Sequence, residues 1–213
     1  MLETLVPSFV TGLLLGGLYG AIAVGLSLIF GIIRVVNFAH GAFLMTAMYA
    51  SYWLWALLGV DPYLSILFVG PAFFLLGYAA QHILIRPMFV RERALVVEPL
   101  GVLLLMAGFD LVLSNLALLF FRADYRSVTH PLGSATFPLF SMILSIPRSI
   151  VFVLAFVLTG GLSWLLARTE LGTAIRSVGQ NREAAALCGV NVYRIYNVTF
   201  GLGTAALAIA GAA

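Results

Sequence analysis

The sequence predicts an all-α, polytopic membrane protein. Of its 213 residues, 62% are hydrophobic and 9% are charged, and the mean hydropathy is +1.11. A soluble domain carries about 25% charged residues, and one of this size could not bury so much apolar surface. Long apolar segments separated by short polar ones recur along the chain. We therefore expect helices that cross a bilayer about six times, because lipid solvates their outward faces.

Six segments reach or approach the roughly 20 apolar residues that a spanning helix needs. They are predicted at about residues 9–33, 39–60, 63–85, 96–121, 149–167 and 198–213. The last segment is the shortest, and it ends on small apolar residues without a polar flank. We therefore expect a chain truncated at its C-terminus, with further helices in the whole protein.

Glycines recur at four-residue spacing in the first segment, at Gly12, Gly16 and Gly20. Small residues at this spacing allow another helix to approach closely in a membrane, where no hydrophobic effect drives helices together. The pattern favours helix packing over contact with a substrate.

The arginines predict an orientation, since they lie between the apolar segments. With the N-terminus outside, eight of the 11 arginines lie on the cytoplasmic side and three outside, as the positive-inside rule requires. The three on the outer side are Arg122, Arg126 and Arg148. The formal net charge of +3 is explained in this way, and we expect no nucleic-acid partner.

The predicted cytoplasmic loop at residues 168–197 contains a short helix at about Asn181–Cys188. Asn181 can cap its N-terminus, and Glu183 lies in the first turn, where an anion is favoured. Gly189 can end it. Ala184, Ala185, Leu187 and Cys188 would give it a small apolar surface that fits a groove of a soluble partner. A connector without a partner explains the same helix equally well.

Glu183-Ala184-Ala185, followed by Gly189 in a long cytoplasmic loop, resembles the EAA-type loop of ABC importer permeases. In the wider importer pattern an isoleucine and a Leu-Pro pair come after the glycine, and this sequence has neither. The chain as a whole resembles the permeases for branched-chain amino acids. The stretches that carry this likeness are residues 16–21, 31–41, 172–176 and 189–191.

The resemblance implies a permease subunit of an ATP-driven importer for branched-chain or related amino acids in the bacterial inner membrane. Urea or short amides are alternative substrates. A second homologous permease subunit, cytoplasmic ATP-binding subunits and an extracytoplasmic substrate-binding protein are the implied partners, besides the lipid bilayer. The residues implied to contact the ATP-binding subunits are Asn181, Glu183, Ala184, Ala185 and Gly189.

Polar residues at membrane depth are candidates for the translocation path. A charge at mid-bilayer costs about 2.5–3.5 kcal/mol on insertion scales, so such residues should face protein or water. Asp110, Ser114 and Asn115 lie in the fourth segment, and Asn37 and His40 precede the second. For Asp110 a hydrogen bond between helices is the alternative, and for Asn37 and His40 it is helix capping and a satisfied histidine at the interface.

Two other function classes compete with a permease. A self-sufficient secondary transporter or channel would place coupling carboxylates at mid-membrane, and Asp110 is the candidate. An intramembrane enzyme would need a nucleophile–base pair, which the sequence does not offer. It also contains neither a P-loop nor a histidine pair with metal-ligand spacing. We therefore expect no catalytic site, no cofactor and no metal.

Overall fold

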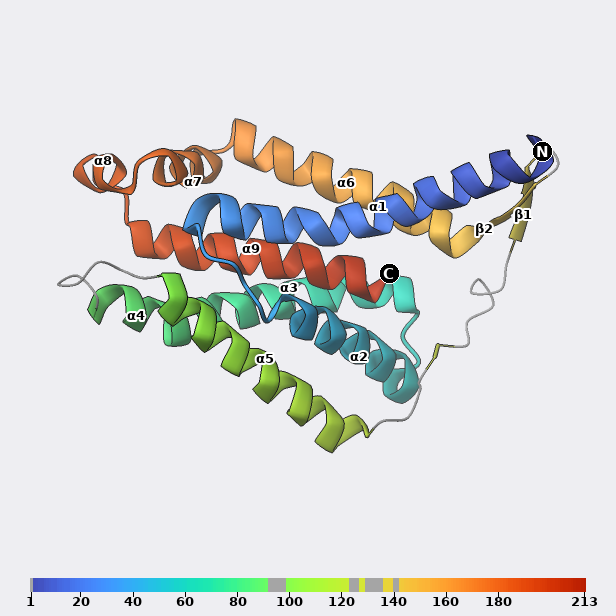
Figure 1. The fold of residues 1–213 in the computed structure, drawn as a ribbon, viewed down its shortest axis with the longest axis horizontal. Coiled ribbons are helices and arrows are strands. Elements are labelled where there is room, and N and C mark those ends of the chain that lie inside the picture. The colour runs from blue at the N-terminus through green and yellow to red at the C-terminus, as the bar shows by residue number, and fades with distance from the viewer. Residues whose placement is uncertain (1, 92–98, 123–126, 129–135, 140–141) are drawn as a thin grey trace.

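A computed structural model describes residues 2–91, 99–122, 127–128, 136–139 and 142–213 (Figure 1). The described elements are, in chain order, α1 (Leu2–Ile33), α2 (His40–Leu58), α3 (Pro62–Ala80), the π-helical turn η1 (Gln81–Ile85), α4 (Arg86–Arg91), α5 (Pro99–Phe121), β1 (Thr136–Leu139), β2 (Met142–Ser145), α6 (Ile146–Arg168), α7 (Glu170–Gln180), α8 (Arg182–Leu187) and α9 (Val192–Ala212).

The predicted class, an all-α polytopic membrane protein, is confirmed. In the described part of the chain, six helices are long and apolar enough to cross a membrane. They are α1, α2, α3 with its continuation to Phe89, α5, α6 and α9. The one departure within these residues is a short antiparallel hairpin, in which β1 pairs with β2 from Thr136 opposite Ser145 to Leu139 opposite Met142.

The helix boundaries differ from the sequence expectations at several ends. The last span begins at Val192 and has 21 residues, so the prediction of a short final segment from residue 198 is wrong. Its start is fixed by Asn191, whose Oδ1 accepts a hydrogen bond from the Arg194 N–H at 3.1 Å. The third span continues through η1 into α4. Residues 96–98 of the predicted fourth span lie outside the described residues.

The core forms around α9, which lies between α1 and α3 and also packs on α2 (Figure 1). The close approach to α1 depends on Gly25 and Gly203, where a Cβ on either glycine would collide with the neighbouring helix. The expected close packing along Gly12, Gly16 and Gly20 is not found within the described chain, because no atom lies within 4 Å of a Cβ built there. The glycines that allow α1 to be approached are instead Gly17 and Gly25.

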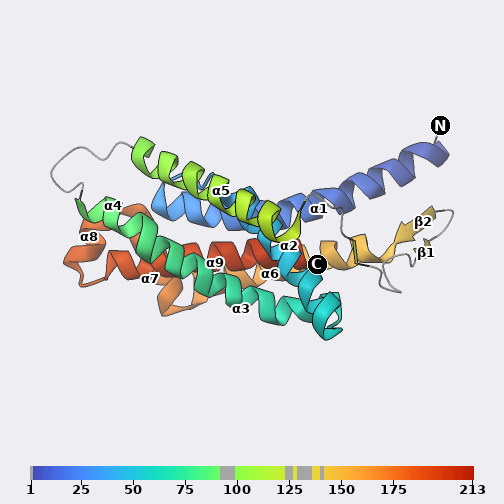
Figure 2. The same cartoon turned by 90° about the horizontal axis from the view of Figure 1, so that it is seen from below.

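The two ends of the helix bundle differ in character (Figures 1 and 2). One end carries α4, α7, α8 and the C-terminus of α1, and the other carries the N-terminus and the hairpin. We refer to the first as the α7–α8 end. Seven arginines of the described residues lie in or directly beside the helix ends and short helices at that end, whereas two belong to the opposite end. The seven are Arg34, Arg86, Arg91, Arg168, Arg176, Arg182 and Arg194, and the two are Arg122 and Arg148.

Candidate functional site

The helix α7 forms a platform at the end of the bundle. The Thr169 hydroxyl accepts a hydrogen bond from the Gly172 N–H at 3.0 Å and caps the helix. Gly172, Ile175 and Val178 recur at three-residue spacing and are buried, so α7 lays one face on the spans. Gly172 cannot carry a side chain here, because a Cβ would collide with the backbone of Leu165 and Leu166 at the sharp turn from α6.

The six-residue helix α8 follows at once and is terminated at both ends. At its start the Asn181 Oδ1 accepts hydrogen bonds from the N–H groups of Glu183 and Ala184, each 3.0 Å long. At its end the Gly189 N–H donates to the Ala186 carbonyl and the Val190 N–H to the Ala185 carbonyl. This double closure is a Schellman motif, and it requires the φ of +84° that Gly189 adopts. The predicted short helix, its Asn181 cap and its Gly189 stop are confirmed.

The two faces of α8 have opposite environments. Ala185 is only 4% exposed and belongs to the same hydrophobic core as α9, whereas Leu187 is 91% exposed. Glu183 and Ala184 are also exposed. The expectation that Ala185 forms part of the outward surface is therefore wrong. Its methyl group anchors α8 to the bundle, because at helical spacing only one face of so short a helix can reach the core.

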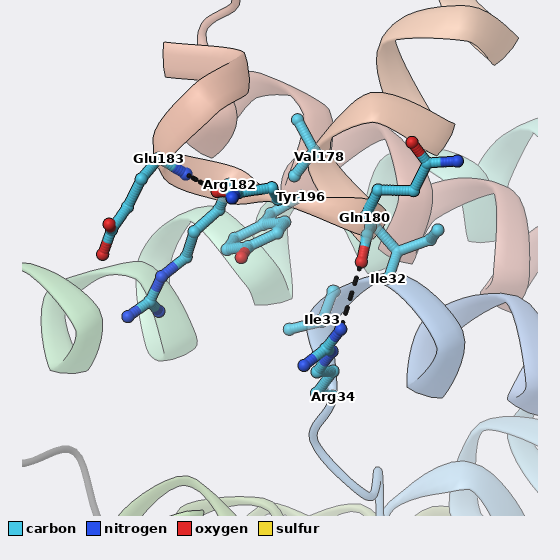
Figure 3. A pocket seen from close by; sticks show the side chains of 10 residues that line it. Ile32, Ile33, Arg34, Val178, Gln180, Arg182, Glu183 and Tyr196 are labelled. Carbon is cyan, nitrogen blue, oxygen red and sulfur yellow. Dashed lines mark hydrogen bonds between the residues drawn. The ribbon is translucent and has the colours of Figure 1, made fainter. Parts of the chain in front are cut away.

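A cavity of about 480 Å³ separates α8 from the end of α1 (Figure 3). Its lining includes Ile33, the last residue of α1, Arg34, which follows α1, and Tyr196 of α9. The Arg34 Nη2 donates to the Gly179 carbonyl of α7 across 3.4 Å. A Cβ on Gly179 would lie 2.8 Å from the Ile32 side chain, so α7 touches α1 beside this cavity. The loop elements and the first span are thus in direct contact.

The chain between α1 and α2 is not helical, although it lies within the bundle. Arg34 ends α1 with a φ of +59°, and side chains then alternate, with Val35, Asn37 and Ala39 buried and those between them exposed. The His40 Nε2 lies 3.2 Å from the Ile22 carbonyl, eleven residues before the end of α1. At 1.5 Å per residue, α2 therefore starts about 16 Å inward from that end. Figure 1 shows this segment running back along the bundle.

Such a break has chemical consequences in a membrane. Non-helical backbone at membrane depth is tolerated where protein buries it or where it lines a water-filled cavity. The first turn of α2 has no side-chain cap, since Ala39 precedes it. Asn37 is 4% exposed, and neither its Oδ1 nor its Nδ2 has a hydrogen-bond partner among the described residues. The His40 Nδ1 is likewise unpaired in this part of the chain. The break therefore holds polar groups without partners.

Further buried polar atoms without partners lie on η1 and α9, and the sequence did not mark them as candidates for the translocation path. Gln81 is 1% exposed with an unpaired Oε1, and the Asn197 Oδ1 and Thr199 Oγ1 are also unpaired among the described residues. Gln81 lies in η1, which packs on α9, and the Asn197 Nδ2 donates to the His82 Nδ1 at 3.1 Å. Asn197 was missed because the last span was predicted to start after it, whereas Thr199 lay inside the predicted span but was not singled out. No sequence pattern revealed the π-helical turn.

These unpaired groups differ from the buried polar groups in the rest of the bundle. Ser51 and Ser65 share a hydrogen bond of 2.7 Å, and the Thr204 hydroxyl donates to carbonyls of α3 and α9. Buried polar groups in native proteins are nearly always paired, with protein or with ordered water. The buried polar atoms without hydrogen-bond partners described above lie on η1, on the first turns of α9 and on the break before α2. That half of the bundle, towards the α7–α8 end, can therefore accept water or a polar solute.

The candidates on α5 are arranged differently. Asp110 and Ser114 are half-buried on one flank of the helix, while Asn115 is exposed and its Nδ2 donates to the Leu111 carbonyl of its own helix. No hydrogen bond within the described residues reaches the Asp110 carboxylate or joins it to Asn37 or His40. The structure thus brings Asn37 and His40 together on the break but does not link the α5 residues to them by a hydrogen bond.

Residues 8–213 match the family described as branched-chain amino acid transport system permease component. The chain is 28% identical to the high-affinity branched-chain amino acid transport system permease protein BraD of Pseudomonas aeruginosa, over 94% of this chain and 67% of that protein. It is 25% identical to the permease protein LivH of Salmonella typhimurium and 23% to LivH of Escherichia coli K12, with the same shares covered. No solved structure matches the chain.

Proposed function

The chain belongs to the family of branched-chain amino acid transport system permease components, and from this premise we propose that it is the membrane-spanning permease subunit of an ATP-driven importer. The observation that carries the proposal is α8, a helix capped at both ends, anchored by Ala185 and exposing Leu187 to solvent. An exposed leucine on an anchored helix suits a groove in a soluble partner. That partner is an ATP-binding subunit, which Asn181, Glu183, Ala184 and Gly189 approach from the membrane side.

Contacts between the loop and the spans support a coupling role. The same core contains Ala185 of α8 and Ile175 of α7, and Gly179 touches the end of α1. Force applied to α8 therefore reaches α1 and α9 through packed side chains, with no flexible linker between them. A movement of α8 caused by ATP binding would shift the end of α1 and with it the break that begins at Arg34.

The arginine distribution supports an orientation in the plasma membrane of a bacterium. The α7–α8 end carries most of the arginines of the described elements, and cytoplasmic loops carry an excess of Arg and Lys. We place that end in the cytoplasm and the N-terminus outside. An extracytoplasmic substrate-binding protein would then deliver substrate to the end that carries the hairpin, and a second homologous permease subunit would complete the path.

We propose that the break between α1 and α2 lines part of the translocation path. Asn37 and His40 offer unpaired polar atoms next to the uncapped start of α2, where the partial positive charge of a helix N-terminus favours an anion. A branched-chain amino acid presents a carboxylate to such a site and an apolar side chain to the neutral helices. Asp110 and Ser114 are proposed to line the same path further along, whereas the amide of Asn115 is used within its own helix.

Co-purification tests the proposal most directly. The tagged full chain, extracted in mild detergent from its native membrane, should retain an ATP-binding subunit, and vesicles containing the assembly should take up radiolabelled leucine when ATP is supplied. Leu187→Glu should release the ATP-binding subunit and abolish uptake. Thr173→Glu is the matched control, because it adds the same charge at an exposed position of α7. Retention of the ATP-binding subunit by Leu187→Glu would rule out α8 as the contact.

A further inference from the structure

The cavity between α8 and the end of α1 has a lining that is polar and basic. Two of its lining residues are arginines, Arg34 and Arg182, and the described lining residues include one carboxylate, Glu183. In Figure 3 the Glu183 side chain lies on the far side of Arg182 from Arg34. The cavity therefore presents more positive than negative charge. Its volume of about 480 Å³ exceeds the roughly 30 Å³ that one water molecule occupies in the liquid many times over.

Neither arginine is neutralised within the described chain. Arg34 donates one hydrogen bond, from Nη2 to the Gly179 carbonyl at 3.4 Å, and a guanidinium has five N–H donors. Arg182 interacts with the Tyr196 side chain. Among the described residues no carboxylate forms an ion pair with either guanidinium. Two guanidinium groups that line one cavity without a carboxylate partner among these residues form a site for an anion, because the planar fork of arginine matches carboxylate and phosphate oxygens.

The position of the cavity indicates which kind of anion it binds. Ile32 and Ile33 end the uncharged part of α1, and Arg34 is the first charged residue after Glu3. The cavity thus lies where a spanning helix leaves the hydrocarbon layer, which is the depth of lipid phosphate groups. Basic pockets between spanning helices at that level bind anionic headgroups. Inorganic phosphate or a phosphorylated solute from the cytosol presents the same chemistry.

We propose that this cavity binds a phosphate-bearing anion, which bridges Arg34 at the end of α1 and Arg182 at the start of α8. The proposal rests on the proposed function only for the assignment of the site to the cytoplasmic side. The bound anion would join the first span to α8 by charge-assisted hydrogen bonds. Occupancy would stiffen the route by which α8 acts on the break at residues 34–39.

Binding can be measured without transport. The full chain, with any subunits that accompany it, is placed in nanodiscs of phosphatidylcholine alone, or with phosphatidylglycerol added, or with inorganic phosphate added, and its thermal unfolding is followed. A higher Tm with phosphatidylglycerol identifies the lipid headgroup as the source, and a higher Tm with inorganic phosphate identifies the free anion. Arg34→Gln and Arg182→Gln should each weaken the response at least about tenfold in half-maximal concentration.

Two controls keep the result specific. Arg168→Gln removes an exposed arginine at the same end that does not line the cavity, and its response should equal that of the natural chain. If a glutamine variant fails to fold, Arg34→Lys and Arg182→Lys replace it, because they keep the positive charge. They should weaken anion binding, since lysine lacks the planar fork of arginine. The proposal is overturned if neither anion raises the Tm, or if Arg168→Gln loses the response equally. It is also overturned if the response needs the ATP-binding subunit, since the arginines would then contact that protein.

Discussion

Gly77 of α3 faces Thr204 of α9 so closely that a Cβ on Gly77 would overlap the Thr204 hydroxyl. The same hydroxyl donates to the Phe73 carbonyl at 3.0 Å, one turn earlier in α3. Small residues allow helix backbones to approach in membranes, and a hydrogen bond across the contact fixes their register. The α3–α9 contact is the most extensive between any two described helices, so this pair of residues holds the core together.

A methyl group at this contact should therefore destabilise the protein. We expect Gly77→Ala to lower the free energy of unfolding by about 1–3 kcal/mol, the usual cost of overpacking, and to lower the Tm in detergent. Gly108→Ala on α5 is the matched control, because no atom lies within 4 Å of a Cβ there. Equal Tm values for the two variants would contradict the tight α3–α9 contact.

Removal of the cap of α8 should weaken coupling more than folding. Asn181→Ala deletes the oxygen that accepts from Glu183 and Ala184, at a typical cost of about 1 kcal/mol, borne locally by α8. We expect a lower ratio of leucine transported to ATP hydrolysed in reconstituted vesicles, with the global Tm nearly unchanged. Asn181→Asp keeps an acceptor oxygen and should restore the ratio. A normal ratio in the alanine variant would show that the capped start of α8 is not needed.

The end of α8 gives a second and independent test. Gly189 has a φ of +84° in open space, so a substitution there costs backbone strain of about 1–2 kcal/mol without a steric collision. Gly189→Val should uncouple ATP hydrolysis from uptake because a β-branched residue resists this conformation. Gly189→Asn should remain coupled, since asparagine tolerates positive φ. If both variants transport normally, the Schellman closure has no functional role.

The elements that could be predicted from the sequence are those fixed by local chemistry. Six apolar runs required six spans, and Asn181 and Gly189 marked the ends of α8 because caps are short-range features. The helix α7 was not predicted, although Thr169 before Gly172, Ile175 and Val178 carries a capping residue and an apolar face. Its low apolar content concealed it among the polar residues of the loop.

Other features depend on contacts between distant residues and have no local signature. The π-helical turn at Gln81–Ile85 contacts α9, far along the chain, and Gln81 is buried there. The inward start of α2 is set by contacts such as that between His40 and Ile22, which are 18 positions apart. Asn37 and His40 could be singled out from the sequence as polar residues beside an apolar run, but their depth in the bundle could not.

The half-buried carboxylate of Asp110 on α5 has two explanations, contact with the transported solute and helix packing, and one variant distinguishes them. Asp110 is half-buried without a hydrogen-bond partner among the described residues, so its charge contributes no visible interaction to the fold. We expect Asp110→Asn to reduce leucine uptake while the Tm stays equal or rises, because a neutral amide is cheaper to bury. Asn115→Ala on the same helix should leave uptake unchanged. Normal uptake with a lower Tm for Asp110→Asn would assign the carboxylate to helix packing.

The unpaired amide of Asn37 gives the sharpest test of the translocation path. A buried polar side chain with neither atom hydrogen-bonded costs stability, and its replacement by an apolar residue of similar shape is neutral or stabilising. We expect Asn37→Leu to keep or raise the Tm. It should reduce leucine uptake at least about tenfold, because it removes one hydrogen bond to a charged solute.

Ser65→Ala supplies the opposite control for that experiment. It breaks the 2.7 Å hydrogen bond to Ser51 in the other half of the bundle, so it should lower the free energy of unfolding by about 1 kcal/mol and leave uptake intact. The two variants together separate a residue kept for solute contact from one kept for folding. A fall in Tm for Asn37→Leu that accounts for its loss of uptake would place Asn37 with the structural residues and remove the break from the path.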